Sequence, residues 1–297
     1  MQFIMKKWKF IALIYLVVSY ILFVFIMDKR TDLLAFSIFV FIGLTFLLFI
    51  GTFIGSIGLI LQVFLKNEKK SAPFFELAVR LGSKNTNILT GYGLILLRRF
   101  QAKEALAIFE KAKATTQQFM YLRSIRTNIA LCYWKLNQLE EALSIYEELF
   151  YYPDLAKIED FTLENLDEGV NKNHNFFAQD FITLGYLYLI HGDLDQALYF
   201  TKVGLAKSPN YGPGFDNLGQ LDYLDGRLDE AIEHFKKGIE NHPGMVDSLY
   251  YLTKIYLEEE DLVQAKMYFD QIDTKRITGL STITHEDYEY MKKELEK

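Results

Sequence analysis

Residues 214–243 read GFDNLGQLDYLDGRLDEAIEHFKKGIENHP, and this stretch decides the fold. Two segments with apolar residues at helical spacing flank a turn at Gly226. Each segment carries one small residue, Gly219 in the first and Ala231 in the second, where two helices can approach closely. Pro243 ends the unit because a helix cannot easily continue through proline. The stretch therefore predicts two helices packed as an αα-hairpin.

The same pattern recurs along the chain, and each copy has an alanine that follows an acidic or amide residue. These alanines are Ala105, Ala142, Ala197, Ala231 and Ala265, separated by 37, 55, 34 and 34 residues. Helical hairpins repeated in this way contact their neighbours and together bury one continuous core. The sequence therefore predicts an all-α solenoid of stacked αα-hairpins.

These repeats resemble the tetratricopeptide repeat (TPR). Residues 214–243 match its pattern with Phe215 in the usual place of tryptophan, and 178–209 match nearly as well. The resemblance covers about 86–279 and implies a right-handed superhelical solenoid with a concave groove that binds protein or peptide partners. Asp222 and Thr201 replace large residues of the pattern, so we expect loose packing at both positions.

The repeats also predict how the chain is divided. Repeats are expected at 86–119, 123–156, 178–211, 212–245 and 246–279, with a connecting half-repeat helix at 71–85, an acidic insertion at 157–177 and a C-terminal capping helix at 284–297. Insertions on solenoids map to loops, often near the binding face. A linker without a role is the alternative for this one.

Two apolar segments precede the repeats and predict a two-helix transmembrane hairpin. Residues 8–27 are longer than the apolar core of a signal peptide and lack a cleavage site, so we expect an uncleaved transmembrane helix. Residues 33–65 form a second apolar segment that exceeds the length of one span. This helix could tilt, project, or end near Gly51 or Gly55 with an interfacial extension.

Lysine and arginine are slightly more frequent in the two outer flanks of this hairpin than in its connecting loop, Asp28–Asp32. This bias favours cytoplasmic termini and a cytoplasmic repeat domain in a two-helix integral membrane protein. Gly51 and Gly55 form a GxxxG motif, which allows close helix packing in lipid. We expect its partner to be helix 8–27, with homodimerisation as the alternative.

Charge and motif content argue against catalysis. The first 70 residues carry eight Lys/Arg and three Asp/Glu, while the whole chain has a net charge of −6, so the remainder is strongly acidic and unsuited to nucleic acid. The chain has one cysteine, Cys132, and its five histidines lack metal-ligand spacing. No phosphate-binding loop or hydrolase motif is present. We therefore expect no catalytic residue, cofactor or metal.

The first helix of each repeat is expected to point residues at i, i+4 and i+7 into the groove. The residues so predicted are Thr127, Leu131, Trp134, Ile182, Tyr186, Leu189, Asp216, Gln220, Tyr223, Tyr250, Lys254 and Leu257. Aromatic and amide side chains suit peptide recognition because they combine apolar area with hydrogen bonding. Tyr186, Tyr223 and Tyr250 are the expected anchors. The alternative is that some of these aromatics only pack between neighbouring helices.

Together these observations predict a membrane-anchored scaffold or adaptor that binds a protein or peptide in the TPR groove and contacts the lipid bilayer through its hairpin. Two alternatives remain open: a self-associating assembly protein, which would form a homo-oligomer, and a non-catalytic accessory domain of a membrane enzyme complex.

Overall fold

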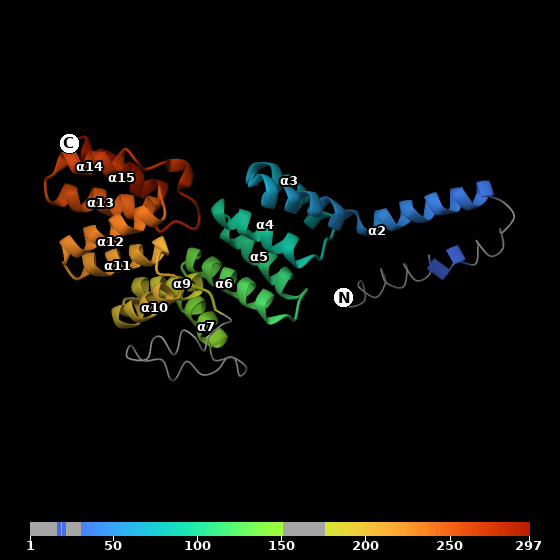
Figure 1. Cartoon of the computed structure of the whole chain (residues 1–297), viewed down its shortest axis with the longest axis horizontal. Helices are drawn as coiled ribbons and strands as arrows, with labels where there is room; N and C mark the ends of the chain where they lie inside the picture. The colour runs from blue at the N-terminus through green and yellow to red at the C-terminus, as the bar shows by residue number, and fades with distance from the viewer. Residues whose placement is uncertain (1–16, 19, 22–30, 151–175) are drawn as a thin grey trace. The chain divides into compact units, whose positions relative to one another are not determined.

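The computed structural model describes residues 17, 18, 20, 21, 31–150 and 176–297 (Figure 1). Several side chains of the first helical turns after residue 31 also fall outside this description. Most of the expected helix 8–27 and nearly all of the insertion 157–177 lie outside the described residues. Within the described ranges every regular element is a helix, as the sequence predicts. The chain divides into two compact units, Met1–Tyr92 and Gly93–Lys297.

In the first unit, helix α2 (Thr31–Leu65) packs against α3 (Glu68–Arg80). Gly51 of α2 comes so close to α3 that an added Cβ would lie 3.1 Å from the Ala78 carbonyl oxygen. At Gly58 the added atom would lie 3.0 Å from the Phe75 ring. At Gly55 the added atom would overlap the side chain of Ile88 and lie 3.0 Å from Ala78. Among the described residues Gly51 and Gly55 of the GxxxG motif therefore approach α3 and Ile88, whereas the sequence suggested helix 8–27, most of which lies outside the described residues. Residues 71–85, expected as a connecting half-repeat, therefore pack on the C-terminal half of α2.

Among the residues whose placement the structure describes, there is no helix long and apolar enough to cross a membrane. The transmembrane hairpin expected over 8–27 and 33–65 therefore has no support from the structure.

The second unit contains the C-terminal part of α4 and, in the described part of the chain, eleven further helical elements. Their bounds are α4 Thr86–Arg98, α5 Ala102–Lys113, α6 Phe119–Lys135, α7 Leu139–Phe150, α9 Ala178–His191, α10 Leu194–Lys207, α11 Gly212–Leu224, α12 Leu228–Asn241, α13 Val246–Glu258, α14 Leu262–Phe269, the 3₁₀ turn η3 Thr274–Arg276 and α15 His285–Leu295. Each first helix packs on the second helix of its pair, and each second helix on the next pair. The pairs α9–α10, α11–α12 and α13–α14 follow one another from yellow to red in Figure 1.

The repeat alanines mark the closest packing between paired helices. All five have no exposed surface, at 0%. Five residues before each alanine the backbone adopts a positive φ that turns the chain between the two helices. These turn residues are Phe100, Asn137, Gly192, Gly226 and Glu260, with φ of 62°, 59°, 93°, 75° and 60°. The positions of the alanines therefore indicate where the turns lie, even in the three repeats whose turn residue is not glycine.

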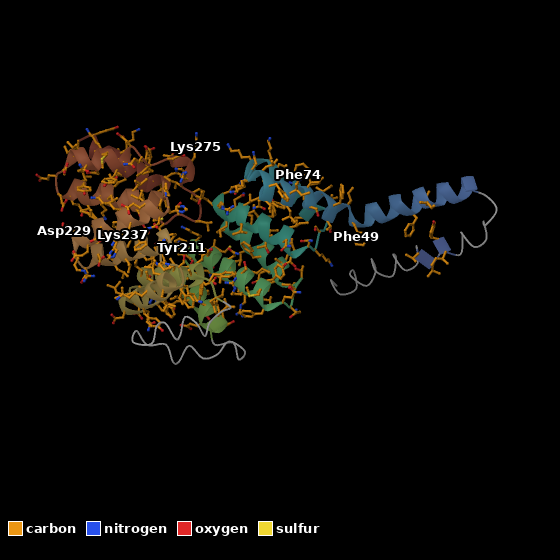
Figure 2. The ribbon with its side chains drawn as sticks, viewed as in Figure 1. Phe49, Phe74, Tyr211, Asp229, Lys237 and Lys275 are labelled. Atoms are coloured by element: carbon orange, nitrogen blue, oxygen red, sulfur yellow. The ribbon has the colours of Figure 1, made fainter. Side chains whose placement is uncertain are left out.

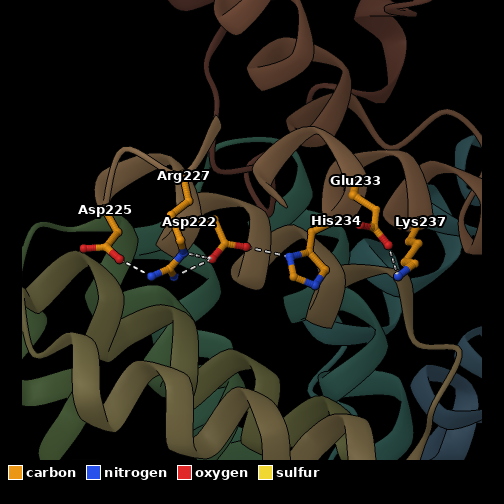
Figure 3. Close-up of polar contacts among 6 residues, drawn as sticks. All are labelled: Asp222, Asp225, Arg227, Glu233, His234 and Lys237. Atoms are coloured by element: carbon orange, nitrogen blue, oxygen red, sulfur yellow. Dashed lines mark hydrogen bonds and ion pairs between the residues drawn. The ribbon is translucent and has the colours of Figure 1, made fainter. Parts of the chain in front are cut away.

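Asp222 and Thr201, where loose packing was expected, are both buried and hydrogen-bonded. Asp222 accepts a hydrogen bond of 2.6 Å from Arg227 Nη2, and its other oxygen lies 2.6 Å from Nδ1 of His234 (Figure 3). Thr201 Oγ1 accepts a hydrogen bond of 3.2 Å from Asn217 Nδ2. The expectation was wrong because polar networks, rather than larger side chains, fill the two positions.

Helix α15 covers the end of the solenoid. Its N-terminus is a capping box in which Thr284 and Asp287 satisfy each other's backbone N–H groups. Met291 and Leu295 are buried in a cluster with Leu249 of α13 and Phe269 of α14. The last described repeat therefore has an apolar inner side and a charged outer side, as terminal repeats require.

Candidate functional site

The second unit contains a cavity of about 700 Å³ formed by several first helices of the repeats. This volume falls within the range typical of ligand-binding sites, about 300–1,000 Å³. Five of the twelve predicted groove residues line it: Leu131 and Trp134 from α6, Ile182 and Tyr186 from α9, and Asp216 from α11. Tyr211, labelled in Figure 2, lines it just ahead of α11.

The aromatic wall of the cavity is built by two of these residues. The rings of Trp134 and Tyr186 meet edge to face, with centroids 5.2 Å apart. The ammonium group of Lys135 lies 3.6 Å from the centroid of the Trp134 ring. Edge-to-face and cation–π contacts are favourable because of the ring quadrupole, and they fix the orientation of both rings. The wall is therefore rigid before any partner binds.

Three other predicted groove residues are engaged within the solenoid. Leu189 is buried in a cluster with Ala197 and Leu221. Gln220 is buried and donates a hydrogen bond of 2.7 Å to Asp216, while Thr127 Oγ1 donates to a carbonyl of its own helix. The structure therefore gives these three residues roles in packing and in holding Asp216.

The remaining four predicted residues form a separate cluster on α11 and α13. Tyr223 donates a hydrogen bond of 2.8 Å from its hydroxyl to Glu258, and Lys254 lies 4.9 Å from the centroid of the Tyr223 ring. Tyr250 and Leu257 pack against the C-terminal core. The three tyrosines expected to act together are thus divided, with only Tyr186 among the cavity-lining residues.

The sequence reasoning missed the segment Ile277–Thr284, which we call the strap. Lys135 Nζ donates a hydrogen bond of 2.6 Å to the carbonyl oxygen of Ser281. Asp247 Oδ1 accepts three hydrogen bonds, from the backbone N–H and the hydroxyl of Thr282 at 2.7 and 2.6 Å and from the backbone N–H of Ile283 at 3.1 Å. Residues of the strap form part of the cavity wall. The sequence signal was weak: ITGLSTIT is uncharged and has no repeat pattern.

Burial changes the protonation of the polar groups around the cavity. It raises the pKa of Asp216 to about 7, an effect increased by the nearby Asp247 carboxylate and opposed by hydrogen bonds from Ser248 and Gln220. It lowers the pKa of Lys135 to about 8, although the charge of Asp247 acts in the opposite direction. Burial therefore favours the protonated form of Asp216, which can donate as well as accept a hydrogen bond.

Tyr186 is affected in the same way. Its pKa is raised, first by burial and then by the charges of its neighbours, while its hydrogen bond with Thr282 acts in the opposite direction. Its hydroxyl therefore stays protonated at physiological pH and serves as a hydrogen-bonding group. A partner entering the cavity meets aromatic rings, neutral hydroxyls and the charged side chains of Arg98, Asp247 and Arg276.

The thiol of the one cysteine is not in a reactive environment. Cys132 is fully buried, and burial raises its pKa to about 12, so the nucleophilic thiolate does not form at neutral pH. Among the described residues no group of three His, Cys, Asp or Glu side chains is placed to hold a metal ion.

Comparisons with known proteins bear on the fold. The tetratricopeptide repeat family model matches residues 124–152, which include α6 from Ser124 onward and all of α7. A comparison with curated proteins finds no significant match. The structure of PilW, a widely conserved type IV pilus biogenesis factor, is similar with a TM-score of 0.52 and 17% identity, covering 75% of this chain and 91% of that one.

Two further structures are more distant. One, from a characterisation of Pseudomonas aeruginosa PilF, has a TM-score of 0.49 and 15% identity, covering 82% of this chain and 97% of that one. The other, YrrB, described as a TPR protein with an unusual peptide-binding site, has a TM-score of 0.37 and 17% identity, covering 74% and 97%. The repeat match and the likeness to PilW establish a TPR-type solenoid fold.

Proposed function

We propose that the second unit binds a peptide segment of a partner protein in the cavity lined by Trp134, Tyr186 and Asp216. The observation that carries this proposal is the convergence of aromatic and neutral polar side chains from three successive first helices on one 700 Å³ cavity. Interfaces that bind peptides combine aromatic anchors with hydrogen-bonding groups in this way. The protein acts as a scaffold or adaptor and not as an enzyme.

The charge of the chain favours a peptide over a nucleic acid. The cavity is lined by two carboxylates, Asp216 and Asp247, and two guanidinium groups, Arg98 and Arg276, and the chain as a whole has a net charge of −6. A negative net charge is unfavourable for binding a phosphate backbone. The N–H and C=O groups of a peptide need acceptors and donors of both kinds, and Asp247 and Lys135 supply them.

The test is site-specific crosslinking from the cavity. A photoreactive amino acid at Thr183, which lines the cavity, should crosslink a partner whose contact peptide is then sequenced. We expect Tyr186→Ala to weaken capture about thirtyfold, because truncating an anchor residue costs about 2 kcal/mol or more. Tyr223→Ala and Tyr250→Ala should have smaller effects. Unchanged capture by Tyr186→Ala would show that the cavity is not the binding site.

Self-association is tested by the same variants. A defined oligomer of the purified chain that Tyr186→Ala dissociates would identify a second copy as the occupant. A monomer that still captures a crosslinked peptide supports a different partner protein. An oligomer that forms equally well with Tyr186→Ala would place self-association outside the cavity.

We further propose that the apolar N-terminal segments anchor the chain to a lipid bilayer, with both termini in the cytoplasm. Residues 10–27 and 33–65 have no charged side chain. On α2 the apolar side chains of Phe49, which Figure 2 labels, and of Phe53, Val63 and Phe64 are exposed in the described structure. Exposed apolar surface of this extent is unfavourable in water and suited to lipid.

The expected result is that the full chain stays with membranes during alkaline extraction. Replacing four exposed side chains of α2 with serine, at Phe49, Phe53, Val63 and Phe64, should weaken this retention. A reporter fused after Lys297 should be active only in the cytoplasm. Release of the unmodified chain by alkali, or reporter activity outside the cytoplasm, would refute this proposal.

A further inference from the structure

The strap is held mainly through its main chain. Lys135 donates to one backbone carbonyl, at Ser281, and Asp247 accepts from two consecutive backbone N–H groups, at Thr282 and Ile283. The backbone N–H of Gly279 donates to the carbonyl of Arg98 at 2.9 Å. Among these hydrogen bonds, only the one from the Thr282 hydroxyl to Asp247 uses a side chain of the strap. Groups that bind a main chain in this way can hold any segment of similar shape.

Side chains of the strap alternate between two environments. Ile277, Ser281 and Ile283 are buried, while Thr278 and Thr282 are partly exposed. The two isoleucines lie in the same apolar cluster as α13, α14 and α15. A segment that fits this place therefore needs a hydroxyl group at position 282, where it contacts Asp247, and an apolar side chain at position 283, which is buried.

The strap also occupies the aromatic wall to which a partner would bind. Thr282 forms a hydrogen bond with Tyr186, the cavity anchor. Lys135, which holds Ser281, covers the face of the Trp134 ring. A partner peptide that used Tyr186, Lys135 and Asp247 would compete with the strap for the same donors and acceptors.

We propose that Ser281-Thr282-Ile283 is an internal substitute for the partner's peptide. This inference rests on the proposed function and specifies its ligand: an uncharged segment in which a residue with a hydroxyl group precedes a β-branched apolar residue. Its main chain takes the place of the strap on Lys135 and Asp247, so the strap must leave before the partner binds. Of the charged residues that flank the strap, Arg276 lines the cavity, whereas Lys275, Glu286 and Asp287 are not among its lining residues.

The strap has an advantage over any free peptide because both of its ends are tethered, by η3 before it and α15 after it. A tethered segment has an effective concentration in the millimolar range. The apparent affinity for a free peptide is reduced by the fraction of molecules in which the strap is displaced. Weakening the strap alone should therefore raise the affinity for a peptide of the same sequence.

The experiment uses fluorescence anisotropy of a labelled synthetic peptide, Gly-Leu-Ser-Thr-Ile-Thr, with the purified full chain. Thr282→Pro removes both the N–H and the hydroxyl that reach Asp247 and leaves Lys135 and Asp247 intact. We expect this variant to bind the peptide at least tenfold more tightly than the unmodified chain. Thr282→Val keeps the N–H and the shape of the side chain, so it should show a smaller increase and serves if the proline variant does not fold.

Two controls connect the binding to the proposed contacts. Adding Asp247→Ala to the Thr282→Val chain should reduce binding at least tenfold, and a Gly-Leu-Ser-Val-Ile-Thr peptide should bind more weakly than the threonine peptide. Backbone amides of 279–283 should exchange hydrogen faster when the threonine peptide is added to the unmodified chain.

Equal affinity of the unmodified and Thr282→Val chains for the peptide, or no binding by any folded variant, would overturn the inference. That failure is distinct from failure of the proposed function. If Tyr186→Ala still abolishes crosslinking of the partner, the cavity binds a partner whose peptide does not resemble the strap.

Discussion

Two neighbouring repeats share one backbone plan but are held together by different interactions. Helix α9 buries Phe181, Leu184 and Leu187, which join an apolar cluster with the second repeat. Helix α11 buries four polar side chains, Asp216, Asn217, Gln220 and Asp222, and has Leu221 as its one large buried apolar residue.

The difference concerns how each helix is held in place, since both contribute to the cavity, α9 through Tyr186 and α11 through Asp216. Burying apolar surface contributes roughly 25 cal/mol per Å², whereas an internal hydrogen bond contributes only about 0.5–1.5 kcal/mol net. Helix α11 therefore adds less to stability than α9. The polar residues Asp216 and Asn217 of α11 instead line the cavity, and their hydrogen bonds fix their orientations. Asn217 is held there by its hydrogen bond of 2.8 Å to the Ile182 carbonyl.

The largest expected effect lies at the ion pair between Arg123 and Asp180, which is buried next to the apolar cluster. Arg123 is 3% exposed and pairs with Asp180, whose carboxylate also accepts the Phe177 N–H. Asp180→Ala should destabilise the fold by about 3–5 kcal/mol because it leaves a buried guanidinium unpaired. Urea denaturation measures the change.

The matched control replaces both partners with apolar residues. Arg123→Met combined with Asp180→Leu should be near neutral, since no buried charge is left without a partner. A loss below 1 kcal/mol in the single variant would show that this junction does not depend on the pair.

The polar helix should show its own dependence on pH. The pKa of Asp216 is about 7 in the folded chain and about 4 in the unfolded chain. Between these values the folded state binds more protons at Asp216, so the contribution of this residue to stability is fully present below pH 4 and is lost as the pH rises toward 7, by at most about 1.4 kcal/mol per pH unit. Asp216→Asn should lose this component. Melting temperatures of both chains at several pH values would show it, and parallel curves would contradict it.

The close approach of paired helices gives the next effect. An added Cβ at Gly219 would lie 2.7 Å from the ring of Phe235, so Gly219→Leu should cost about 1–3 kcal/mol by overpacking. Gly185→Leu, at the same repeat position of α9, should cost at least as much because backbone atoms of Ala197 and Thr201 lie 3.0 Å away. Thermal denaturation tests both, and an unchanged Tm for Gly219→Leu would refute the assigned register.

The smallest effect is expected on the outer face. Lys237 forms an exposed ion pair of 2.6 Å with Glu233 one helical turn earlier (Figure 3). Such pairs contribute about 0.3–0.5 kcal/mol. Lys237→Ala should therefore lower stability by no more than this and leave peptide binding unchanged. A larger loss of binding would mean that the outer face, and not the cavity, contacts the partner.

The sequence by itself determined the paired helices, their turns and their register. These features depend on residues close together in the chain, and the same pattern recurs in each repeat. The buried alanines and the positive-φ turns could therefore be located from the spacing of the pattern alone. It also placed Trp134, Tyr186 and Asp216 toward a groove, because the direction of a side chain on a helix follows from its position.

Only the tertiary structure decided which groove residues share a cavity, and that the strap crosses it. The hydrogen bond between Lys135 and Ser281 joins residues 146 positions apart. The contact depends on the accumulated rotation of several repeats, and no local pattern in ITGLSTIT encodes it. The same applies to α2: the sequence assigned Gly51 to helix 8–27, whereas among the described residues Gly51 lies against Ala78 and Leu81. Periodicity specifies which face of a helix is buried, while the neighbour that covers it is chosen by the packing of the whole unit.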